Sequence, residues 1–247
     1  MHRKERAQSG TLQRICGTIS DIQCTRDVAS FVFLEAEQTA IGVVAIAANL
    51  VGTLVQSDGT AATDMLEEAD YVEFTLDDRP IKGWVWRSPF NNGDVVEVIA
   101  DCQRDYFEAY AIARPADRIV ALYPHCSRGW ISHWLNAAKW WLLGSAFSVA
   151  LLISMFLLHA LFFSPSWAET QKYMADLVPA SAAVLILLAL VATVLLAKRW
   201  MSFVHLAELV FHEYGWQSPA TVDLKKRSKK GRTNSDGAEY GVFFFRY

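Results

Sequence analysis

WLLGSAFSVALLISMFLLHALFF (Trp141–Phe163) and LVPASAAVLILLALVATVLLA (Leu177–Ala197) are the two stretches that decide the fold of this chain. They are 23 and 21 residues long and contain no Lys, Arg, Asp or Glu. A helix needs about 20 apolar residues to cross the roughly 30 Å of hydrocarbon in a bilayer. The pair predicts a two-helix transmembrane hairpin, because two buried core helices of this length would need more surrounding protein than 247 residues supply.

Basic residues flank the hairpin unevenly. Two follow the second run and four precede the first, whereas the link between the runs, Ser164–Asp176, contains only Lys172. The positive-inside rule then places both termini on the cytoplasmic side, and aromatic residues at the ends of both runs fit a membrane interface. The flanking basic residues are Arg114, Arg118, Arg128, Lys139, Lys198 and Arg199, and the aromatic residues are Trp140, Trp141, Trp167, Tyr173 and Trp200.

The residues before the hairpin predict short β-strands. Tyr71–Leu76 alternates between apolar and other side chains, which is the period-2 pattern of a half-buried strand. Turn sequences follow at Asp77–Pro80 (DDRP) and Asn91–Asp94 (NNGD). Short strands joined by such turns predict a small antiparallel β-barrel of the OB or SH3 type. Further strands are expected at residues 15–23, 30–36, 81–87, 95–100 and 106–112.

These patterns predict an α+β membrane protein. We expect an N-terminal tail at 1–14, a cytoplasmic β-barrel-like domain at 15–125, the two membrane helices, and a cytoplasmic helix with a basic tail at 198–247.

One segment inside the barrel domain is apolar without alternation. Ala40–Val55 (AIGVVAIAANLVGTLV) is short for a membrane span, so we expect a helix packed on the barrel or lying at the membrane surface. A third crossing is the alternative. The acidic stretch Ser57–Asp70 predicts a surface loop or a short helix.

The residues after the second run begin with another helical pattern. Lys198–Trp216 predicts a cytoplasmic continuation of the second membrane helix, with Gly215 as its end. The apolar residues near helical spacing in this stretch are Phe203, Leu206, Leu209 and Val210.

A basic run follows at Lys225–Arg232 (KKRSKKGR), with six basic residues in eight. Near an anionic leaflet each basic side chain contributes on the order of 1 kcal/mol, so the run predicts contact with lipid head groups. A solvated tail is the alternative, and we expect no nucleic-acid binding because no aromatic residue interleaves the run. The expected head-group ligands are Lys225, Lys226, Arg227, Lys229, Lys230 and Arg232.

The sequence shows no motif for catalysis or cofactor binding. It contains no Gly-rich phosphate loop, G-x-S-x-G elbow or H-E-x-x-H zinc motif. His125, Cys126 and His133 lie within nine residues, but their spacing matches no standard zinc pattern, and structural roles are expected. We therefore expect no catalytic residue, no metal and no cofactor.

Charge differs between the two halves of the chain. Residues 1–125 contain 19 acidic and 11 basic residues, a net charge of −8, whereas residues 126–247 contain 7 and 12, a net charge of +5. An acidic domain repels nucleic acid and favours a basic partner, although a solvated acidic surface without a partner gives the same composition. Trp84, Trp86 and Phe90 predict either an aromatic contact patch or, more commonly, barrel core.

Several motifs resemble one family of bacterial membrane proteins. The family is associated with type VI secretion and is often labelled as putative type VI secretion effectors. The YAIARPADRIVALYPHCSRG block is the most specific of the matching segments. These segments are ADYVEF (Ala69–Phe74), GWVWRSPF (Gly83–Phe90), GDVVEVIA (Gly93–Ala100), YAIARPADRIVALYPHCSRG (Tyr110–Gly129), and the late GW (Gly215, Trp216) with VDLKK (Val222–Lys226).

The resemblance implies a protein of the bacterial inner membrane that takes part in bacterial competition. Proteins in type VI loci include immunity proteins, which neutralise a cognate toxin. Because an acidic cytoplasmic face suits a basic, nuclease-type toxin, we expect an immunity protein. A secreted membrane-active effector and a structural adaptor of the secretion machinery are the alternatives. The expected partner-binding residues are Glu67, Glu68, Asp70, Asp77, Asp78, Trp84 and Trp86.

Overall fold

The computed structural model of the protein describes residues 12–30, 66–163, 166–233 and 236–247. The chain divides into two compact units. The first combines Met1–Trp130 with Ser202–Tyr247, and the second is Ile131–Met201. The helix expected at Ala40–Val55 and most of the expected N-terminal tail lie outside the described residues.

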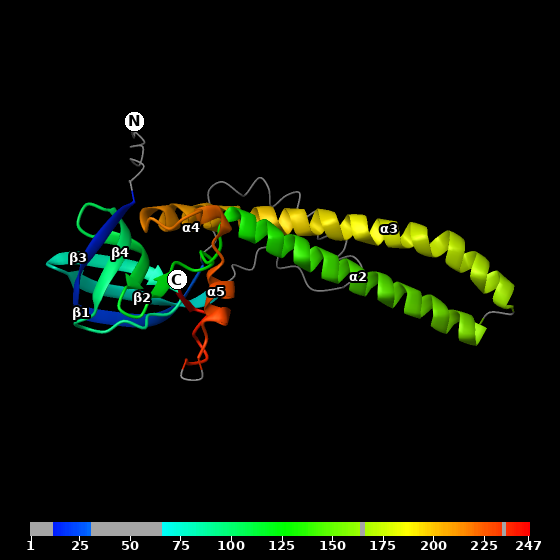
Figure 1. The fold of residues 1–247 in the computed structure, drawn as a ribbon, viewed down its shortest axis with the longest axis horizontal. Helices are drawn as coiled ribbons and strands as arrows, with labels where there is room; N and C mark the ends of the chain where they lie inside the picture. Colours follow the sequence, from blue (N-terminus) through cyan, green and yellow to red (C-terminus); the bar gives the residue numbers. More distant parts are fainter. Residues whose placement is uncertain (1–11, 31–65, 164–165, 234–235) are drawn as a thin grey trace, which may run out of the picture. The chain divides into compact units, whose positions relative to one another are not determined.

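Five strands form a closed barrel in the first unit (Figure 1). β1 (Gln13–Ser30) pairs with β2 (Leu66–Leu76) and β4 (Val95–Cys102), β2 pairs with β3 (Arg79–Val85), and β4 pairs with β5 (Phe107–Arg114), all antiparallel. A parallel pairing of β3 with β5 closes the barrel in the order β1-β2-β3-β5-β4. The expected small β-barrel is confirmed, with this one parallel pair as a difference.

β1 pairs with two different strands along its length. Its first part, Gln13–Thr18, pairs with β4, and its second part, Ile19–Ser30, pairs with β2. The register shifts around Asp21, which has a positive φ of 53° and marks a β-bulge. The bulge bends the strand, and β1 is one continuous element that includes the strand expected at 15–23. Of the strand expected at 30–36, only Ser30 lies within the described residues. Ser30 is paired with Leu66, so the strands that flank residues 31–65 belong to the same barrel.

Alternating strand residues fill the interior of the barrel. Val72, Phe74 and Leu76 of β2 are at most 4% exposed, as their alternation predicts. The other members of the core are Ile15, Ile19, Ile81, Val85, Phe90, Val96, Val98, Ala100, Ala109, Ile112 and Ala121. Phe90 is therefore barrel core rather than part of an aromatic contact patch.

Closure of the barrel depends on Gly83 in β3. A Cβ atom at this position would lie 2.3 Å from the carbonyl oxygen of Ala109 in β5, well inside van der Waals contact. A glycine lets the two backbones approach closely enough to pair.

Asp77 and Asp78 form the two-residue turn between β2 and β3. Both have positive φ angles, 45° and 66°, as a type I′ hairpin turn requires. The Asp77 carboxylate also accepts a hydrogen bond from the backbone N–H of Thr18, at 3.0 Å. The turn expected here is confirmed, and both acidic residues have a structural role in it.

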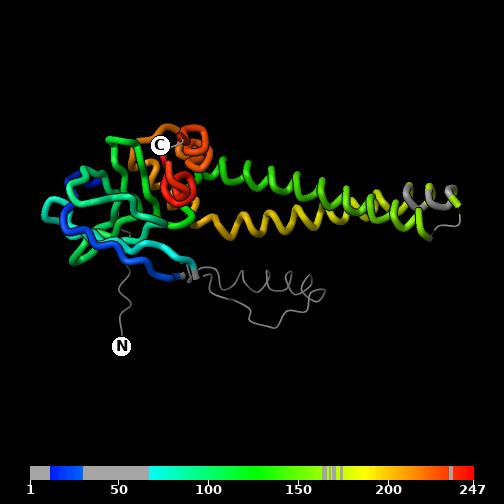
Figure 2. Tube along the Cα trace, turned by 90° about the horizontal axis from the view of Figure 1, so that it is seen from below, coloured from blue at the N-terminus to red at the C-terminus, as the bar shows by residue number. Residues whose placement is uncertain are grey.

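The chain after the hairpin folds back onto the barrel instead of forming a separate basic tail. β6 (Ile119–Leu122) pairs with β5, and the C-terminal strand β7 (Phe244–Arg246) pairs with β6. Between them in the first unit come α4 (Met201–Glu213), the 3₁₀ helix η1 (Pro219–Thr221) and α5 (Leu224–Lys230). Figure 2 shows these C-terminal segments beside the barrel strands.

α4 is a separate helix and not a continuation of the second apolar helix, which ends at Arg199. Of the apolar residues near helical spacing, Leu209 is 57% exposed. Gly215 ends the helix as predicted: its φ is +72°, and Trp216 N–H donates to the carbonyl of Phe211 in a Schellman-type cap. The buried residues of α4 are Phe203, Val204, Ala207, Val210 and Phe211.

The second unit is an antiparallel pair of helices, α2 (Trp130–Phe163) and α3 (Trp167–Arg199). Two contacts fix their pairing. His133 Nε2 lies 3.0 Å from the carbonyl oxygen of Ala197, and the indole N–H of Trp141 donates to the carbonyl of Ile186 at 3.3 Å. The two expected helices are present.

Both helices extend beyond the charge-free runs 141–163 and 177–197. Each helix begins with residues, some of them polar, that precede its charge-free run. Three residues therefore separate the two helices, where a longer link was expected. Pro179 consequently lies well inside α3 and not in its first turn.

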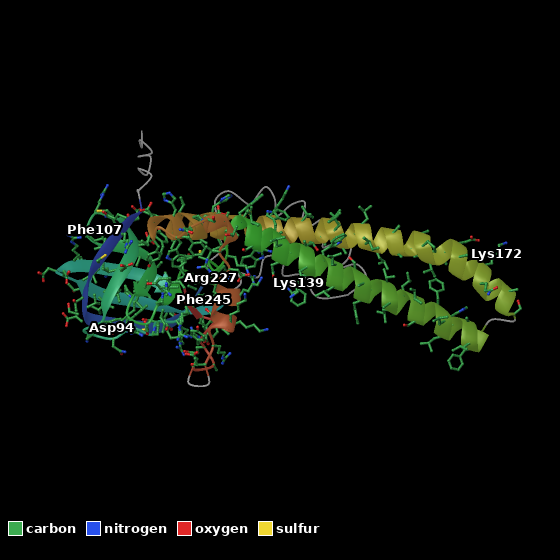
Figure 3. All side chains as sticks on the ribbon, in the orientation of Figure 1. Asp94, Phe107, Lys139, Lys172, Arg227 and Phe245 are labelled. Atoms are coloured by element: carbon green, nitrogen blue, oxygen red, sulfur yellow. The ribbon has the colours of Figure 1, made fainter. Side chains whose placement is uncertain are left out.

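Apolar side chains of the hairpin face outward. Leu151, Leu161 and Leu187 are 61%, 76% and 60% exposed, and only 6% of the most apolar window of each helix is buried. A core helix of a soluble protein would bury such residues. Lys139 and Lys172, labelled in Figure 3, lie toward opposite ends of the hairpin, with the charge-free stretch between them. Both helices are long and apolar enough to cross a membrane.

Candidate functional site

A shallow groove of about 260 Å³ lies on the outer surface of β1, β2 and β3. Neighbouring residues of a strand point to opposite faces, so the core positions Val72 and Phe74 leave Tyr71 and Glu73 facing outward. The lining residues are Gln23, Thr25, Asp27, Tyr71, Glu73 and Trp84, and we refer to them as the aromatic–acidic groove.

An aromatic pair occupies the centre of this groove. Tyr71 in β2 is the cross-strand partner of Trp84 in β3, and their ring centroids are 4.9 Å apart. Thr25 in β1 continues the same row, because it pairs with Tyr71. Three strands thus present one flat row of side chains on the outside of the barrel.

Trp84 and Trp86 both lie outside the barrel. Val85, between them, is fully buried and faces the core, so the alternation of β3 directs both indoles outward. The interpretation of these tryptophans as barrel core is therefore wrong. Trp86 is covered by other residues of the first unit, with His125 and Phe243 at ring distances of 4.9 and 5.7 Å. Trp84 remains with Tyr71 in the groove.

Carboxylates border the aromatic pair. Glu73 forms an ion pair with Lys82 at 2.8 Å, and Asp27 accepts the backbone N–H of Val28 at 2.7 Å. Burial, together with the neighbouring Glu73, raises the pKa of the Tyr71 hydroxyl, which keeps it a hydrogen-bond donor at neutral pH. Aromatic faces beside carboxylates suit a cationic group such as a Lys or Arg side chain.

Glu67, Glu68 and Asp70 lie in β2 and not in a surface loop. Each has a basic partner within the first unit. Glu67 is 2.8 Å from His125 Nε2, Glu68 is 3.4 Å from Arg87, and Asp70 is 3.1 Å from Arg26. Asp70 is only 3% exposed and also accepts the backbone N–H of Ser88 at 3.0 Å. These acidic residues bind parts of their own domain.

Arg87 is the centre of this charged cluster. Its side chain is 10% exposed and lies 3.6 Å from Asp70 and 3.7 Å from Glu239, in addition to its contact with Glu68. The guanidinium also lies over the ring of Phe243, 4.9 Å from its centroid. Since Glu239 and Phe243 belong to the C-terminal segment, Arg87 ties that segment to the start of β2.

His125 is held in a fixed position by its neighbours. It adopts a positive φ of 68°, and its ring lies 4.9 Å from Trp86 and 5.1 Å from Phe203. Burial lowers the pKa of the imidazole although Glu67 acts in the opposite direction. At neutral pH the ring is therefore uncharged, and its Nε2–H donates to the Glu67 carboxylate.

The sequence-neighbouring His125, Cys126 and His133 do not form one site. Cys126 is buried, which raises the pKa of its thiol and makes it a poor nucleophile. His133 belongs to the helical unit, where it contacts Ala197. Within the ranges that the structure describes, no group of three or more His, Cys, Asp or Glu side chains is arranged to hold a metal ion.

The five acidic residues expected to bind a partner do not share one surface. Glu67, Glu68 and Asp70 lie at the start of β2, whereas Asp77 and Asp78 follow its end. Asp27 and Glu73, which the sequence analysis did not select, are the carboxylates beside the aromatic pair. The alternation of Tyr71–Leu76 was the signal that could have identified Tyr71 and Glu73, because it places both on the outer face.

The basic run forms helix α5 and the residues after it. Lys225 is partly buried, with its ammonium 5.4 Å from the Trp86 ring, and burial lowers its pKa. The remaining basic side chains, Lys226, Arg227, Lys229, Lys230 and Arg232, are exposed.

Comparison with known proteins returned no relative: no protein-family model, no curated protein and no solved structure matches the chain.

Proposed function

We propose that this protein is a membrane-anchored binding protein, in which an OB-type barrel captures a basic segment of a partner protein in the aromatic–acidic groove. Together with the resemblance to type VI secretion proteins, this favours an immunity protein that neutralises a cognate basic toxin. The single observation that supports the proposal best is the Tyr71–Trp84 pair placed between Asp27 and Glu73 on the outer face of three strands.

The barrel topology supports binding at this face. The cyclic strand order β1-β2-β3-β5-β4, with a long bent β1, is the order of an OB-fold, whose ligands contact the face around strands 2 and 3. Many OB-folds bind nucleic acids with exposed aromatic side chains and basic grooves. Here Asp27 and Glu73 lie beside the aromatic pair, and although Glu73 is paired with Lys82, the two carboxylates disfavour a polyanion and favour a Lys- or Arg-containing segment.

Connectivity supports the two-span arrangement that we propose. The segments before α2 and after α3 fold into the same unit, so both ends of the hairpin must be on one side of any membrane that it crosses. The basic residues at these ends favour the cytoplasmic side. At about 1.5 Å per residue, the 34 residues of α2 exceed the thickness of the hydrocarbon, which leaves the polar start of α2 outside it.

Affinity purification of the full chain from its native cell, solubilised in detergent, tests the proposal. We compare the unaltered protein with Asp27→Lys, which reverses a charge in the groove, and with Glu213→Lys, which reverses one at the end of α4 as a matched control. A basic toxin should be retained by the unaltered protein and the control. Retention should fall at least about tenfold with Asp27→Lys, as for loss of one interface hot spot.

Other outcomes would contradict the immunity function. Equal recovery of the toxin with both variants would show that the groove does not bind the toxin. Recovery of secretion components without a toxin would favour a structural adaptor. Recovery of no partner, combined with leakage of liposomes that contain the purified protein, would favour a membrane-active effector.

A further inference from the structure

The exposed basic side chains of α5 and the residue after its C-cap form a positively charged surface, which we call the α5 basic surface. Among the described residues, none of its side chains has a carboxylate within ion-pair distance. Figure 3 labels one of its members, Arg227. The surface consists of Lys226, Arg227, Lys229, Lys230 and Arg232.

Acidic residues close in sequence are engaged elsewhere. Asp223 caps the start of α5 through Lys226 N–H and forms an ion pair with Arg128 at 3.1 Å. Asp236 pairs with Arg246 at 3.3 Å. Glu239 lies 3.7 Å from Arg87. The positive charge of the α5 basic surface is therefore not neutralised by the nearest carboxylates of its own segment.

The surface is held on a folded support. Leu224 and Ser228, on the opposite face of α5, are fully buried. The Ser228 hydroxyl accepts the backbone N–H of Arg246 at 2.9 Å, which fixes α5 against β7. The guanidinium of Arg246 donates to the carbonyl of Gly231 at 2.9 Å, just before Arg232. The basic side chains thus project from an ordered backbone, which reduces the entropy lost when they bind a ligand.

From this arrangement we propose that the α5 basic surface binds anionic phospholipid head groups. The proposal rests on the membrane placement in the proposed function and is independent of any toxin. Two chain connections, at Trp130 and at Arg199–Met201, tie the first unit to the apolar hairpin. A bilayer that contains the hairpin is then present at high effective concentration, and its phosphates complement the unpaired cations.

A nucleic acid fits the surface less well than lipid. The run 225–232 contains no aromatic side chain on which a base could stack, and the barrel domain of the same unit is acidic. A lipid head group needs only phosphate contacts, which Lys and Arg provide.

Amine-reactive labelling of the full chain in nanodiscs tests this proposal. One set of nanodiscs contains phosphatidylcholine alone, and the other also contains phosphatidylglycerol. We expect labelling of Lys226, Lys229 and Lys230 to fall several-fold, on the order of fivefold or more, in the anionic nanodiscs and to recover at high salt. Lys82 on β3, which is partly exposed and pairs with Glu73, is the internal control, and its labelling should not differ between the two kinds of nanodisc.

Three results would overturn the proposal. The first is equal labelling of the α5 lysines in both kinds of nanodisc. The second is an equal fall in labelling of the α5 lysines in phosphatidylcholine nanodiscs when inorganic phosphate or a single-stranded oligonucleotide is added. This result would assign the surface to a soluble anion or to nucleic acid. The third is failure of the chain to enter either nanodisc, which would contradict the membrane placement itself. Failure to find a toxin affects none of these readouts.

A triple variant, Lys226→Gln with Lys229→Gln and Lys230→Gln, gives a second measurement. Because these side chains are exposed, the substitutions leave the buried face of α5 intact. Native mass spectrometry should detect several-fold less retained phosphatidylglycerol than with the unaltered chain, whereas Lys82→Gln should retain the full amount. Unchanged retention in the triple variant would contradict the proposal.

Discussion

The barrel and the hairpin use apolar side chains in opposite ways. In the barrel, Val72, Leu76 and Ile81 are completely buried, whereas on the hairpin Leu151 and Leu161 are more than half exposed. Large apolar surfaces left in water are unfavourable, which is consistent with a hairpin that crosses a membrane. The same kind of side chain thus fills the core of one unit and covers the outside of the other.

The largest effect is expected in the unit that contains the barrel. Arg87→Met leaves the carboxylates of Glu68, Asp70 and Glu239 without their central cation and should lower the free energy of unfolding by about 3–5 kcal/mol. Denaturant unfolding of the full chain in detergent, followed by tryptophan fluorescence, measures this. Arg26→Met, at a side chain that is 54% exposed, should have a much smaller effect than Arg87→Met. Equal losses for both variants would contradict the central role of Arg87.

A charge introduced into the hairpin tests whether its outer face lies in lipid or in water. Leu151→Arg should raise the free energy of membrane insertion by about 2.5–3.5 kcal/mol, because an arginine would lie near the middle of a charge-free span. Leu135→Arg is the matched control on the same helix, since Leu135 is 66% exposed but precedes the span. The fraction of chain recovered in the membrane measures the effect. If both variants insert equally well, the outer face of α2 does not lie in lipid.

Barrel closure is tested by Gly83→Ala. The added methyl group would overlap the carbonyl of Ala109, so the barrel should lose about 1–3 kcal/mol of stability, as for other overpacking substitutions. Gly237→Ala is the control, because a Cβ atom there meets nothing within 4 Å, and its unfolding midpoint should stay unchanged. An unchanged midpoint for Gly83→Ala would contradict the close approach of β3 and β5.

The smallest effect concerns pH. Burial lowers the pKa of folded His125 below the value of about 6.5 in the unfolded chain. The unfolded chain therefore binds the proton first, and this contribution to stability is complete above pH 6.5 and is lost as the pH falls through the folded pKa. The unfolding midpoint should decline between pH 7.5 and 5.5, and less steeply in His125→Gln. Identical slopes for the two proteins would contradict a buried neutral imidazole.

Elements with a local pattern could be predicted from the sequence. The hairpin follows from the absence of charge in 141–163 and 177–197, and the β2–β3 hairpin follows from the alternation of 71–76 with the turn after it. The ends of α2 and α3 were predicted less well, because polar residues continue a helix as readily as apolar ones when the helix leaves the apolar region.

Elements that depend on distant partners could not be predicted. Ser57–Asp70 was expected as a surface loop or a short helix because it is acidic, yet its described part, from Leu66, belongs to β2. Its charges are matched by Arg26, Arg87 and His125 from other parts of the chain. The basic run was expected as a tail, although Leu224, the residue just before it, is buried and holds α5 in the fold. The groove needed the pairing of β1 with β2, which brings Asp27 close to Tyr71 and which no local pattern contains.

The most direct test of the contrast between the two units is to determine from which side of the membrane cysteines in each unit can be labelled. Cys16, Cys24 and Cys102 are exposed on the barrel, and Lys172→Cys adds a thiol at the far end of the hairpin. A membrane-impermeant maleimide is applied to spheroplasts and to inside-out inner-membrane vesicles, and labelled peptides are identified by mass spectrometry. We expect the barrel cysteines to react only in the vesicles and position 172 only in the spheroplasts. Reaction of both sets from the same side would contradict a two-span protein with a cytoplasmic barrel.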